Sequence, residues 1–299
     1  MEKILNGKKN KRESRGAVGK KTGGELIAFV IVFVILSLFA LSYIFAFLWA
    51  IFAATKTHDQ VLINPFDWHK IWNFKNYIDI FSVFEVRGIK MPAMIFNSLW
   101  FTISSAALTI MGSALMAYAI AKFQFIGKKL LISVNFIVMT LPVIGALPAS
   151  YKMISTLRLV DSPLLLITRI GTFGAYLLIL MSFFRNLSDE YREAAVIDGA
   201  GEYKILFMII FPLARGPVFA LFIMNIVAVW NDYMTALLYL PNMPTLSTGV
   251  YLFRVEMIYR ARMDLLLAAT VITAIPPLIL YLLFNKSILT NVSIGGIKG

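Results

Sequence analysis

The residue types that usually carry catalysis are scarce in this sequence. Cysteine is absent, which excludes disulfides, thiolate metal sites and catalytic thiols. The two histidines, His58 and His69, share one polar loop and are too few for a zinc site. The phosphate-binding motif G-x-x-x-x-G-K-[ST] does not occur, because Gly19-Lys20 and Gly127-Lys128 lack both the upstream glycine and the following hydroxyl residue. The sequence therefore predicts no catalytic, metal or cofactor site, and any use of ATP requires a separate chain.

A polar segment at residues 185–212 has the most informative spacing in the chain. Ser188 can cap a helix, and the two acidic residues that follow it suit the positive end of the helix dipole. Three residues then fall at i, i+3 and i+4 on one helix face: Tyr191, Ala194 and Ala195. The small alanines on that face would let the backbone of another protein come close. Gly199 supplies a left-handed stop, and Pro212 marks the entry into the next apolar run.

The composition predicts that this segment belongs to a membrane protein. Of the 299 residues 59% are hydrophobic and 15% are charged, with a mean hydropathy of +0.78, whereas roughly a quarter of a typical globular sequence is charged. The net charge of +12 does not favour nucleic acid, because eight lysines and arginines gather in residues 1–21, directly before an apolar run. That arrangement is typical of a cytoplasmic tail beside anionic lipid.

Six apolar runs predict an all-α membrane protein with six transmembrane helices. The runs are residues 26–54, 93–121, 130–150, 163–184, 213–240 and 265–284. With the amino terminus inside, the internal segments hold more of the 28 basic residues than the external ones, while the acidic residues divide evenly. Both termini are therefore expected in the cytoplasm, and the polar segment lies on the same side.

The domain organisation follows from these runs. We expect a basic cytoplasmic tail at 1–25, a first transmembrane helix at 26–54, an external loop at 55–92, a membrane core at 93–285 and a cytoplasmic tail at 286–299. Short interfacial helices with tryptophans at the headgroup level are expected in the external loop.

The spacing in the polar segment resembles the signature loop of permease subunits of ATP-binding-cassette (ABC) importers. That signature is Glu-Ala-Ala, three residues, Gly, nine residues, Ile, one residue and Leu-Pro. Glu193-Ala194-Ala195, Gly199, Ile209 and Pro212 match in register, and Phe211 replaces the leucine. An interfacial amphipathic helix is the plain alternative, but it does not predict the Gly and Pro offsets.

The resemblance implies a type I ABC importer transmembrane domain whose coupling helices dock into a cleft on the ATPase. The residues that it assigns to ATPase coupling are Tyr191, Glu193, Ala194, Ala195, Asp198, Gly199 and Ala200. It also implies four kinds of partner besides membrane lipid: a second permease subunit, two ABC ATPase subunits, an extracellular substrate-binding protein and the transported solute.

Further short motifs resemble the carbohydrate-uptake branch, especially the smaller permease of maltose-type systems. They are residues 96–99, 117–121, 139–142, 197–200 and 230–232, and the resemblance covers about residues 30 to 295. Residues 147–151 depart from it, because the family has a tighter Pro-Leu-Tyr there. The resemblance implies a sugar or oligosaccharide as cargo.

A sugar pathway needs polar and aromatic groups within an apolar cavity. The candidates are Asn97, Tyr118, Asn135, Asn225, Trp230, Asn231, Asp232 and Tyr233. Amides that bond between helices and rings in the outer aromatic belt are the structural alternatives. We favour the structural interpretation for the single polar residues, and both remain open for residues 230–232. In the loop at 241–264 we expect Tyr251, Arg254 and Glu256 to contact the binding protein.

Three other functions remain as alternatives. The first is an ABC importer for a non-sugar solute such as an amino acid, phosphate, polyamine or metal. The second is a secondary transporter, which normally needs carboxylates deep in the spans; Asp232 is the only acidic residue well inside an apolar run. The third, a membrane-embedded enzyme, lacks any catalytic pair in register.

Overall fold

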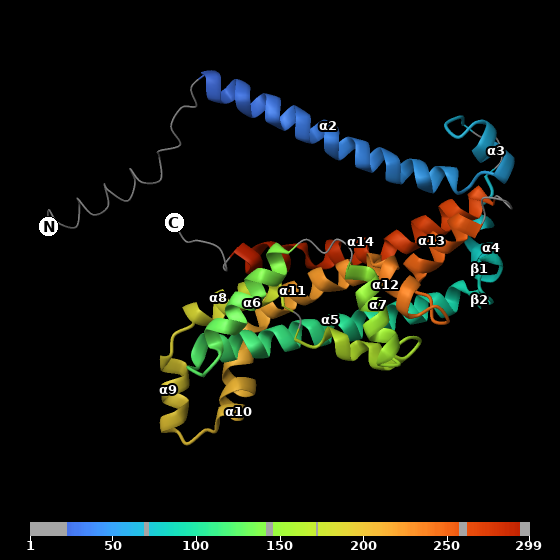
Figure 1. Cartoon of the computed structure of the whole chain (residues 1–299). Coiled ribbons are helices and arrows are strands. Elements are labelled where there is room, and N and C mark those ends of the chain that lie inside the picture. Colours follow the sequence, from blue (N-terminus) through green and yellow to red (C-terminus); the bar gives the residue numbers. More distant parts are fainter. Residues whose placement is uncertain (1–22, 69–71, 142–145, 172, 257–261, 294–299) are drawn as a thin grey trace. The chain divides into compact units, whose positions relative to one another are not determined.

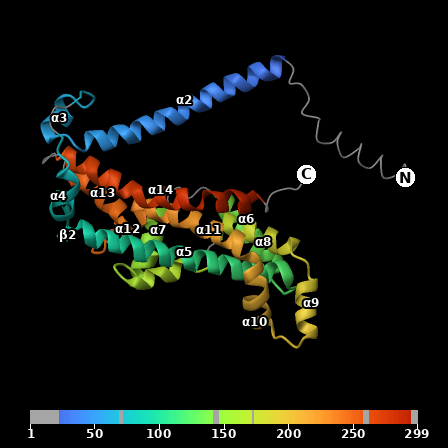
Figure 2. The ribbon, with the colours of Figure 1, turned by 180° about the vertical axis from the view of Figure 1, so that it is seen from behind.

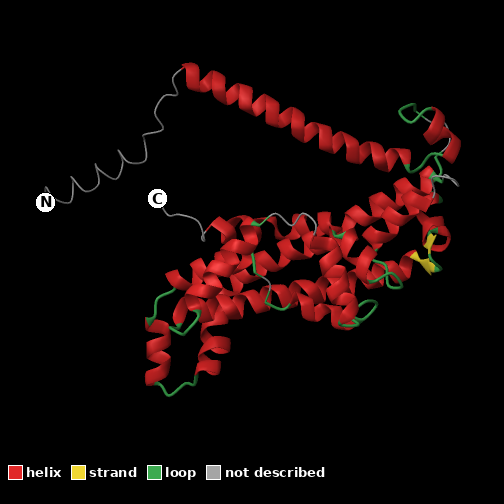
Figure 3. Cartoon of the chain, in the orientation of Figure 1, coloured by secondary structure: helices red, strands yellow, loops and turns green. Residues whose placement is uncertain are grey.

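The computed structural model of the chain is helical apart from one short β-hairpin among the residues it describes (Figures 1 and 3). Those residues are 23–68, 72–141, 146–171, 173–256 and 262–293. The basic tail predicted at 1–25 therefore lies almost wholly outside them, as do His69 and Pro142. The chain divides into two compact units, residues 1–53 and residues 54–299.

The described part of the first unit is a single helix, α2 (Gly23–Ala53), whose one charged residue is Glu25. Its apolar side chains occupy every face, as in a helix surrounded by lipid. At about 1.5 Å per residue it exceeds a hydrocarbon core of about 30 Å. It matches the run predicted at residues 26–54.

The second unit is a helical bundle with the hairpin at one end (Figure 2). Its elements are α3 (His58–Ile63), α4 (Asn76–Val83), β1 (Glu85–Val86), β2 (Ile89–Lys90), α5 (Met91–Lys122), α6 (Lys128–Thr140), α7 (Ala146–Thr156), the 3-10 helix η1 (Pro163–Arg169), α8 (Ala175–Asn186), α9 (Glu190–Ile197), α10 (Glu202–Ile205), the π-helix η2 (Leu206–Ile210), α11 (Phe211–Asn231), α12 (Tyr233–Tyr239), α13 (Leu246–Glu256) and α14 (Met263–Ser293).

Helix α5 is the centre of this bundle and packs against α8, α11 and α13. One face of α5 is lined by small residues, which lets neighbouring backbones come close. At Gly112 a Cβ atom would lie 2.4 Å from the backbone nitrogen of Gly171, so this contact requires glycine. Close helix contacts of this kind are typical of membrane proteins.

Four described helices are long and apolar enough to cross a membrane: Gly24–Ala53, Met91–Lys122, Glu202–Asn231 and Met263–Ile288. The remaining two predicted runs are not single helices. The run at 130–150 is divided between α6 and α7. The run at 163–184 begins as a 3-10 helix and continues as α8 only from Ala175, because Gly171 and Gly174 have positive φ angles of 64° and 148°.

The run predicted at 213–240 also differs from one continuous helix. Helix α11 ends at Asn231. The carboxylate of Asp232 then caps α12 by accepting a hydrogen bond from the Thr235 backbone N–H at 3.0 Å. An Asp side chain that bonds its own backbone competes with helix propagation. The break therefore lies at the polar cluster of residues 230–232, which is also a candidate for the pathway.

The loop predicted as external contains the helices α3 and α4, as expected, and a hairpin that was not expected. Arg87 and Gly88 at its turn have φ angles of 54° and 80°, which suits a tight two-residue turn. Lys56 holds the preceding segment together. Its ammonium donates to the carbonyl oxygens of Asn64, Pro65 and Asp67 at 2.8, 3.0 and 2.7 Å. Burial lowers the Lys56 pKa, and the charge of Asp67 opposes that shift.

Candidate functional site

The polar segment forms a helical hairpin that projects from the bundle end opposite α4 and the β-hairpin (Figures 1 and 2). Helix α9 ends at Ile197, and Gly199 takes a φ of 75°. That left-handed conformation is the helix stop predicted from the sequence. Gly201 then begins α10, which continues through η2 into α11. The hairpin is therefore joined directly to a helix that is long and apolar enough to cross a membrane.

The surface of this hairpin carries apolar side chains that the described chain does not cover. Ile197 and Tyr203 at its tip are 86% and 82% exposed, and Tyr191 on α9 is 49% exposed. Ala195 differs from the expectation that it faces a partner, because it is 5% exposed and belongs to the chain's own core with Ile205. The accessible side of α9 is therefore formed by Tyr191, Glu193 and Ala194 rather than by both alanines.

Two basic side chains tie the hairpin to the end of α5, and the sequence pattern did not identify either of them. The first is Lys122, the last residue of α5, whose side chain is 6% exposed. Its ammonium donates to the carbonyl oxygen of Leu187 at 2.5 Å and to the carboxylate of Asp189 at 2.6 Å. These bonds hold the segment that enters α9.

The second is Arg192, which joins the two arms of the hairpin. Its guanidinium pairs with the carboxylate of Glu202 on α10, and it lies 5.3 Å from the ring centroid of Phe123, just after α5. The hydrogen bond with Glu202 raises the Arg192 pKa above its ordinary value. The sequence did contain a signal for this pair, because Arg192 and Glu202 have opposite charges and lie ten residues apart on either side of a glycine turn. We call Lys122, Arg192 and Glu202 the basal clamp.

The residues considered for a substrate pathway do not form one cluster. Tyr118 lies near the hairpin of α9 and α10, where its ring packs edge-on against Phe123 and Phe184 at 5.6 Å each. Asn135 is fully buried and accepts a hydrogen bond from the Gly174 backbone at 2.6 Å. Asn225 is 8% exposed, and its side-chain oxygen has no hydrogen-bond partner among the described residues.

The other pathway candidates gather at the opposite end of the bundle. The Trp230 indole N–H donates to the carbonyl of Thr273 on α14 at 3.0 Å, and the indole lies in the core. Asn97 donates to the Pro244 carbonyl at 3.1 Å, and Asn231 donates to the Val227 carbonyl at 2.8 Å. These three polar groups bond to backbone carbonyls of the same chain, which favours a structural role for them.

Tyr233 stacks on Tyr251 with the ring centroids 4.6 Å apart. A residue predicted for the substrate pathway therefore contacts one predicted to touch the binding protein. Both rings lie at the end of the bundle that also holds Asn97 and Trp230. Arg254 is exposed on α13, whereas the Glu256 side chain lies outside the described residues.

Arg169 is a further polar residue at this cluster, and the sequence pattern assigned it no role. Its guanidinium lies 3.9 Å from the Asp232 carboxylate, 3.3 Å from the Thr235 hydroxyl and 5.7 Å from the centroid of the Phe101 ring. Arg169 thereby connects η1 to the break between α11 and α12.

The comparisons with known proteins agree with this architecture. Residues 110–292 match the family model described as "Binding-protein-dependent transport system inner membrane component". The chain belongs to this family. It is an ABC importer permease, a multi-pass inner-membrane protein that works with a substrate-binding protein and an ATPase and is not itself the catalytic subunit.

Several curated relatives align with this permease over most of their length. The diacetylchitobiose uptake system permease protein NgcG of Streptomyces coelicolor is 28% identical over 87% of this chain and 86% of that protein. The trehalose/maltose transport system permease protein MalG of Thermococcus litoralis is 29% identical over 88% of this chain and 94% of that protein.

The fold is also similar to that of a solved structure. A chain from a bacterial ABC transporter involved in the import of the acidic polysaccharide alginate superposes with a TM-score of 0.71. It is 18% identical and covers 89% of this permease and 98% of that chain. The permease therefore has the ABC importer fold, as the resemblance in the polar segment implied.

Proposed function

We propose that this permease is one half of the membrane pore of an importer for a sugar or oligosaccharide. The cargo rests on the relatives, which are named for diacetylchitobiose, trehalose and maltose, and sulfoquinovosyl glycerol. The observation that carries the mechanism is the exposed hairpin of α9 and α10, which continues into α11. The other half is a second permease subunit, and two ATPase subunits complete the motor.

The hairpin is suited to dock into another protein. Its apolar tip residues, Ile197 and Tyr203, remain exposed in the isolated chain, and burying such side chains in a partner's cleft stabilises a complex. Glu193 and Asp198 are exposed beside them and offer carboxylates to basic groups of the partner. We assign ATPase docking to this surface, with Gly199 as the turn that shapes it.

The topology that fits this function has six spans with both termini in the cytoplasm. Helices α2, α5, α11 and α14 supply four spans, and α6–α7 and η1–α8 supply the two interrupted ones. The hairpin is then cytoplasmic, where an ATPase is available, and α13 is external, where a binding protein is available. Tyr251 and Arg254 on α13 are our candidates for that external contact.

Uptake assays on matched glycine variants test the coupling role. Gly199 has a φ of 75° and Gly201 a φ of −72°, and a Cβ atom added to either residue would meet no other atom within 4 Å. A side chain at residue 199 costs about 1 kcal/mol in the left-handed region, whereas residue 201 tolerates one. We expect Gly199→Asp to abolish ATP-driven sugar uptake and the matched Gly201→Asp to retain it, with equal amounts of both variants in the membrane.

Glu193→Lys tests the docking surface without altering the backbone. Because Glu193 is exposed, this change leaves folding intact and reverses one charge of the proposed contact. We expect it to abolish uptake and to reduce co-purification of the ATPase. Full uptake by both Gly199→Asp and Glu193→Lys would contradict the proposed coupling.

The cargo is tested separately by ligand binding. A substrate-binding protein that co-purifies with the transporter should bind one member of a panel of mono- and oligosaccharides. Binding of an amino acid, phosphate, polyamine or metal in place of every saccharide would favour the alternative importer and leave the coupling proposal intact.

A further inference from the structure

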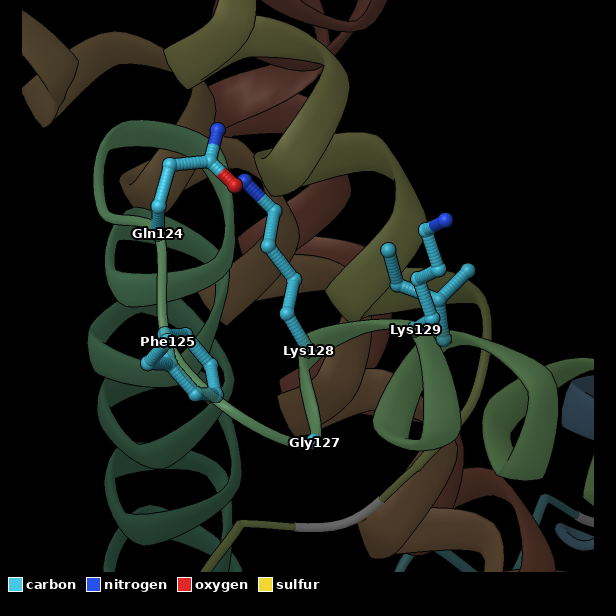
Figure 4. A pocket seen from close by; sticks show the side chains of 6 residues that line it. Gln124, Phe125, Gly127, Lys128 and Lys129 are labelled. Atoms are coloured by element: carbon cyan, nitrogen blue, oxygen red, sulfur yellow. The ribbon is translucent and has the colours of Figure 1, made fainter.

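A pocket of about 430 Å³ lies at the turn that connects α5 to α6 (Figure 4). Its lining residues are Gln124, Phe125, Gly127, Lys128, Lys129 and Ile132. Two of the six are lysines and none is acidic, so the pocket offers positive charge and amide groups to a ligand. The pocket lies close to the base of the hairpin, because Lys128 bonds to Phe123 and Arg192 lies over the Phe123 ring, but none of its lining residues belongs to the hairpin.

The positive charge of this pocket is not neutralised within the described chain. Lys128 donates one hydrogen bond to the Phe123 carbonyl at 3.0 Å, which leaves two of its three N–H groups for another acceptor. Neither lysine takes part in any of the ion pairs found among the described residues. In Figure 4 the Lys128 side chain extends toward Gln124, and Lys129 lies on the other side of the turn.

The local backbone adds to this excess of positive charge. Helix α6 begins at Lys128, and its N-cap residue, Gly127, has no side chain to accept bonds from the first-turn N–H groups. The positive end of the helix dipole and two lysines therefore occupy the same turn, an arrangement that is unfavourable without an anion. A bound anion in the pocket would offset all three contributions.

Apolar side chains next to the lysines identify the setting of the pocket. Ile126 is completely exposed, Leu130 is 66% exposed and Phe125 is 40% exposed. The turn follows a membrane-crossing helix at the end where Lys122 contacts the coupling hairpin. Lysines beside exposed apolar groups at the end of a span are typical of the membrane interface, where basic pockets bind lipid headgroups.

We propose that this pocket binds the phosphate headgroup of an anionic membrane lipid. Lys128 and Lys129 supply the charge, Gln124 supplies an amide, and the neighbouring Ile126 and Leu130 contact the acyl region. A free phosphate ion shares the headgroup's charge but gains nothing from the apolar neighbours, so the lipid is the favoured source. Placing the pocket in the cytoplasmic leaflet rests on the proposed function, whereas binding itself does not.

Native mass spectrometry of the full-length permease, purified with its partner subunits, tests this proposal. Delipidated complex is titrated with phosphatidylglycerol or phosphatidylcholine. Each lysine near a membrane surface contributes about fivefold to the affinity for anionic lipid, so Lys128→Gln with Lys129→Gln should weaken phosphatidylglycerol binding by roughly 25-fold. Lys286→Gln on α14 is the control, because Lys286 lies outside the pocket.

A second variant separates the pocket from general electrostatic attraction. Gln124→Trp keeps both lysines but fills the space, so it should also reduce phosphatidylglycerol binding while the complex stays assembled. Equal binding of the two lipids by the wild type, unchanged binding by the double lysine variant, or the same loss in Lys286→Gln would overturn the proposal. Displacement of the lipid by an equal concentration of inorganic phosphate would overturn the lipid as the ligand. None of these measurements depends on uptake, so their failure would leave the transport function intact.

Discussion

Arg192 links both arms of the hairpin of α9 and α10 to the end of α5. It pairs with Glu202 across the hairpin and lies over Phe123 after α5. Both partners of the pair are substantially solvent-exposed, so the ion pair contributes at most about 1 kcal/mol to stability. In the proposed coupling mechanism, its larger effect is to keep α9 and α10 together when the hairpin moves relative to α5.

Charge reversal at this pair tests that role. Arg192→Glu places two carboxylates together, which separates the arms of the hairpin. We expect substrate-stimulated uptake to fall about fivefold or more, within the usual range of coupling energies, while ATP hydrolysis becomes less dependent on substrate. Adding Glu202→Arg should recover part of the uptake, although the contact with Phe123 stays lost. Arg185→Glu, an exposed reversal at the end of α8, is the matched control. An unchanged ratio of uptake to ATP hydrolysis in Arg192→Glu would contradict the proposed role of the basal clamp in coupling.

Lys56 is the equivalent structural residue of the loop between α2 and α4, because it donates to three backbone carbonyls while being only 1% exposed. Lys56→Met leaves those carbonyls without this donor. Hydrogen bonds to a charged group contribute about 2 kcal/mol. We therefore expect a lower thermal midpoint in detergent, measured by tryptophan fluorescence, since Trp68 and Trp72 lie in the same loop. Lys75→Met, at an exposed lysine, should leave the midpoint unchanged.

The lowered pKa of Lys56 adds a pH dependence to this difference. Below its folded pKa the ammonium is protonated in both states, and the desolvation of its charge offsets part of the stability that the three hydrogen bonds contribute. Between the folded pKa and the ordinary lysine pKa of 10.5 the unfolded chain binds more protons, so the free energy of unfolding rises with pH. The difference in the free energy of unfolding between wild type and Lys56→Met should therefore increase from pH 7.5 toward about pH 10. A difference that decreases over this pH range would contradict a lowered pKa of Lys56 in the folded state.

At the scale of elements, helix breaks mark the places that the sequence predicted least well. Hydropathy located the long apolar helices because the spans Gly24–Ala53, Met91–Lys122, Glu202–Asn231 and Met263–Ile288 contain few charges over more than 25 residues each. It did not predict the 3-10 segment η1 or the division at Asp232. Both breaks have local causes, the positive φ angles of Gly171 and Gly174 and the cap by Asp232, and contacts between residues about 60 positions apart accompany them: Gly171 approaches Gly112, and Arg169 contacts Thr235.

Substitutions of Asp232 test whether its cap of α12 or its negative charge is needed for stability and uptake. Asp232→Ala removes the cap of α12, which costs about 1 kcal/mol, and leaves Arg169 without its acidic neighbour. Asp232→Asn keeps an acceptor for the Thr235 N–H and removes only the charge. We expect Asp232→Asn to retain the wild-type thermal midpoint and Asp232→Ala to lower it, with Asn231→Ala as the neighbouring control. If Asp232→Asn lowers uptake at an unchanged midpoint, the carboxylate belongs to the pathway.

At the scale of the whole molecule, the sequence predicted the family-level architecture better than the individual contacts. The offsets from Glu193 to Pro212 led to the family that the comparisons show, and the structure adds that this segment is a helical hairpin with a left-handed turn at Gly199 and a direct connection to α11. Contacts of Lys122 and Arg192 were not predictable in the same way, since a basic residue near a membrane end has many possible partners. The pathway candidates were chosen by residue type alone, and several proved to bond to the chain's own backbone.

The proposed six-span topology can be tested directly because the chain contains no cysteine. Single cysteines at Glu85, Ile126, Lys152 and Ile197 replace exposed residues in successive connections of the chain. With six spans, a membrane-impermeant maleimide should label Glu85→Cys and Lys152→Cys on intact cells, and Ile126→Cys and Ile197→Cys only after permeabilisation. Lys152 is the decisive position, because α6 and α7 must cross together to bring it outside. If only the four long helices cross, Lys152→Cys is protected like Ile126→Cys, whereas labelling of Ile197→Cys from outside would remove the hairpin from the reach of any ATPase.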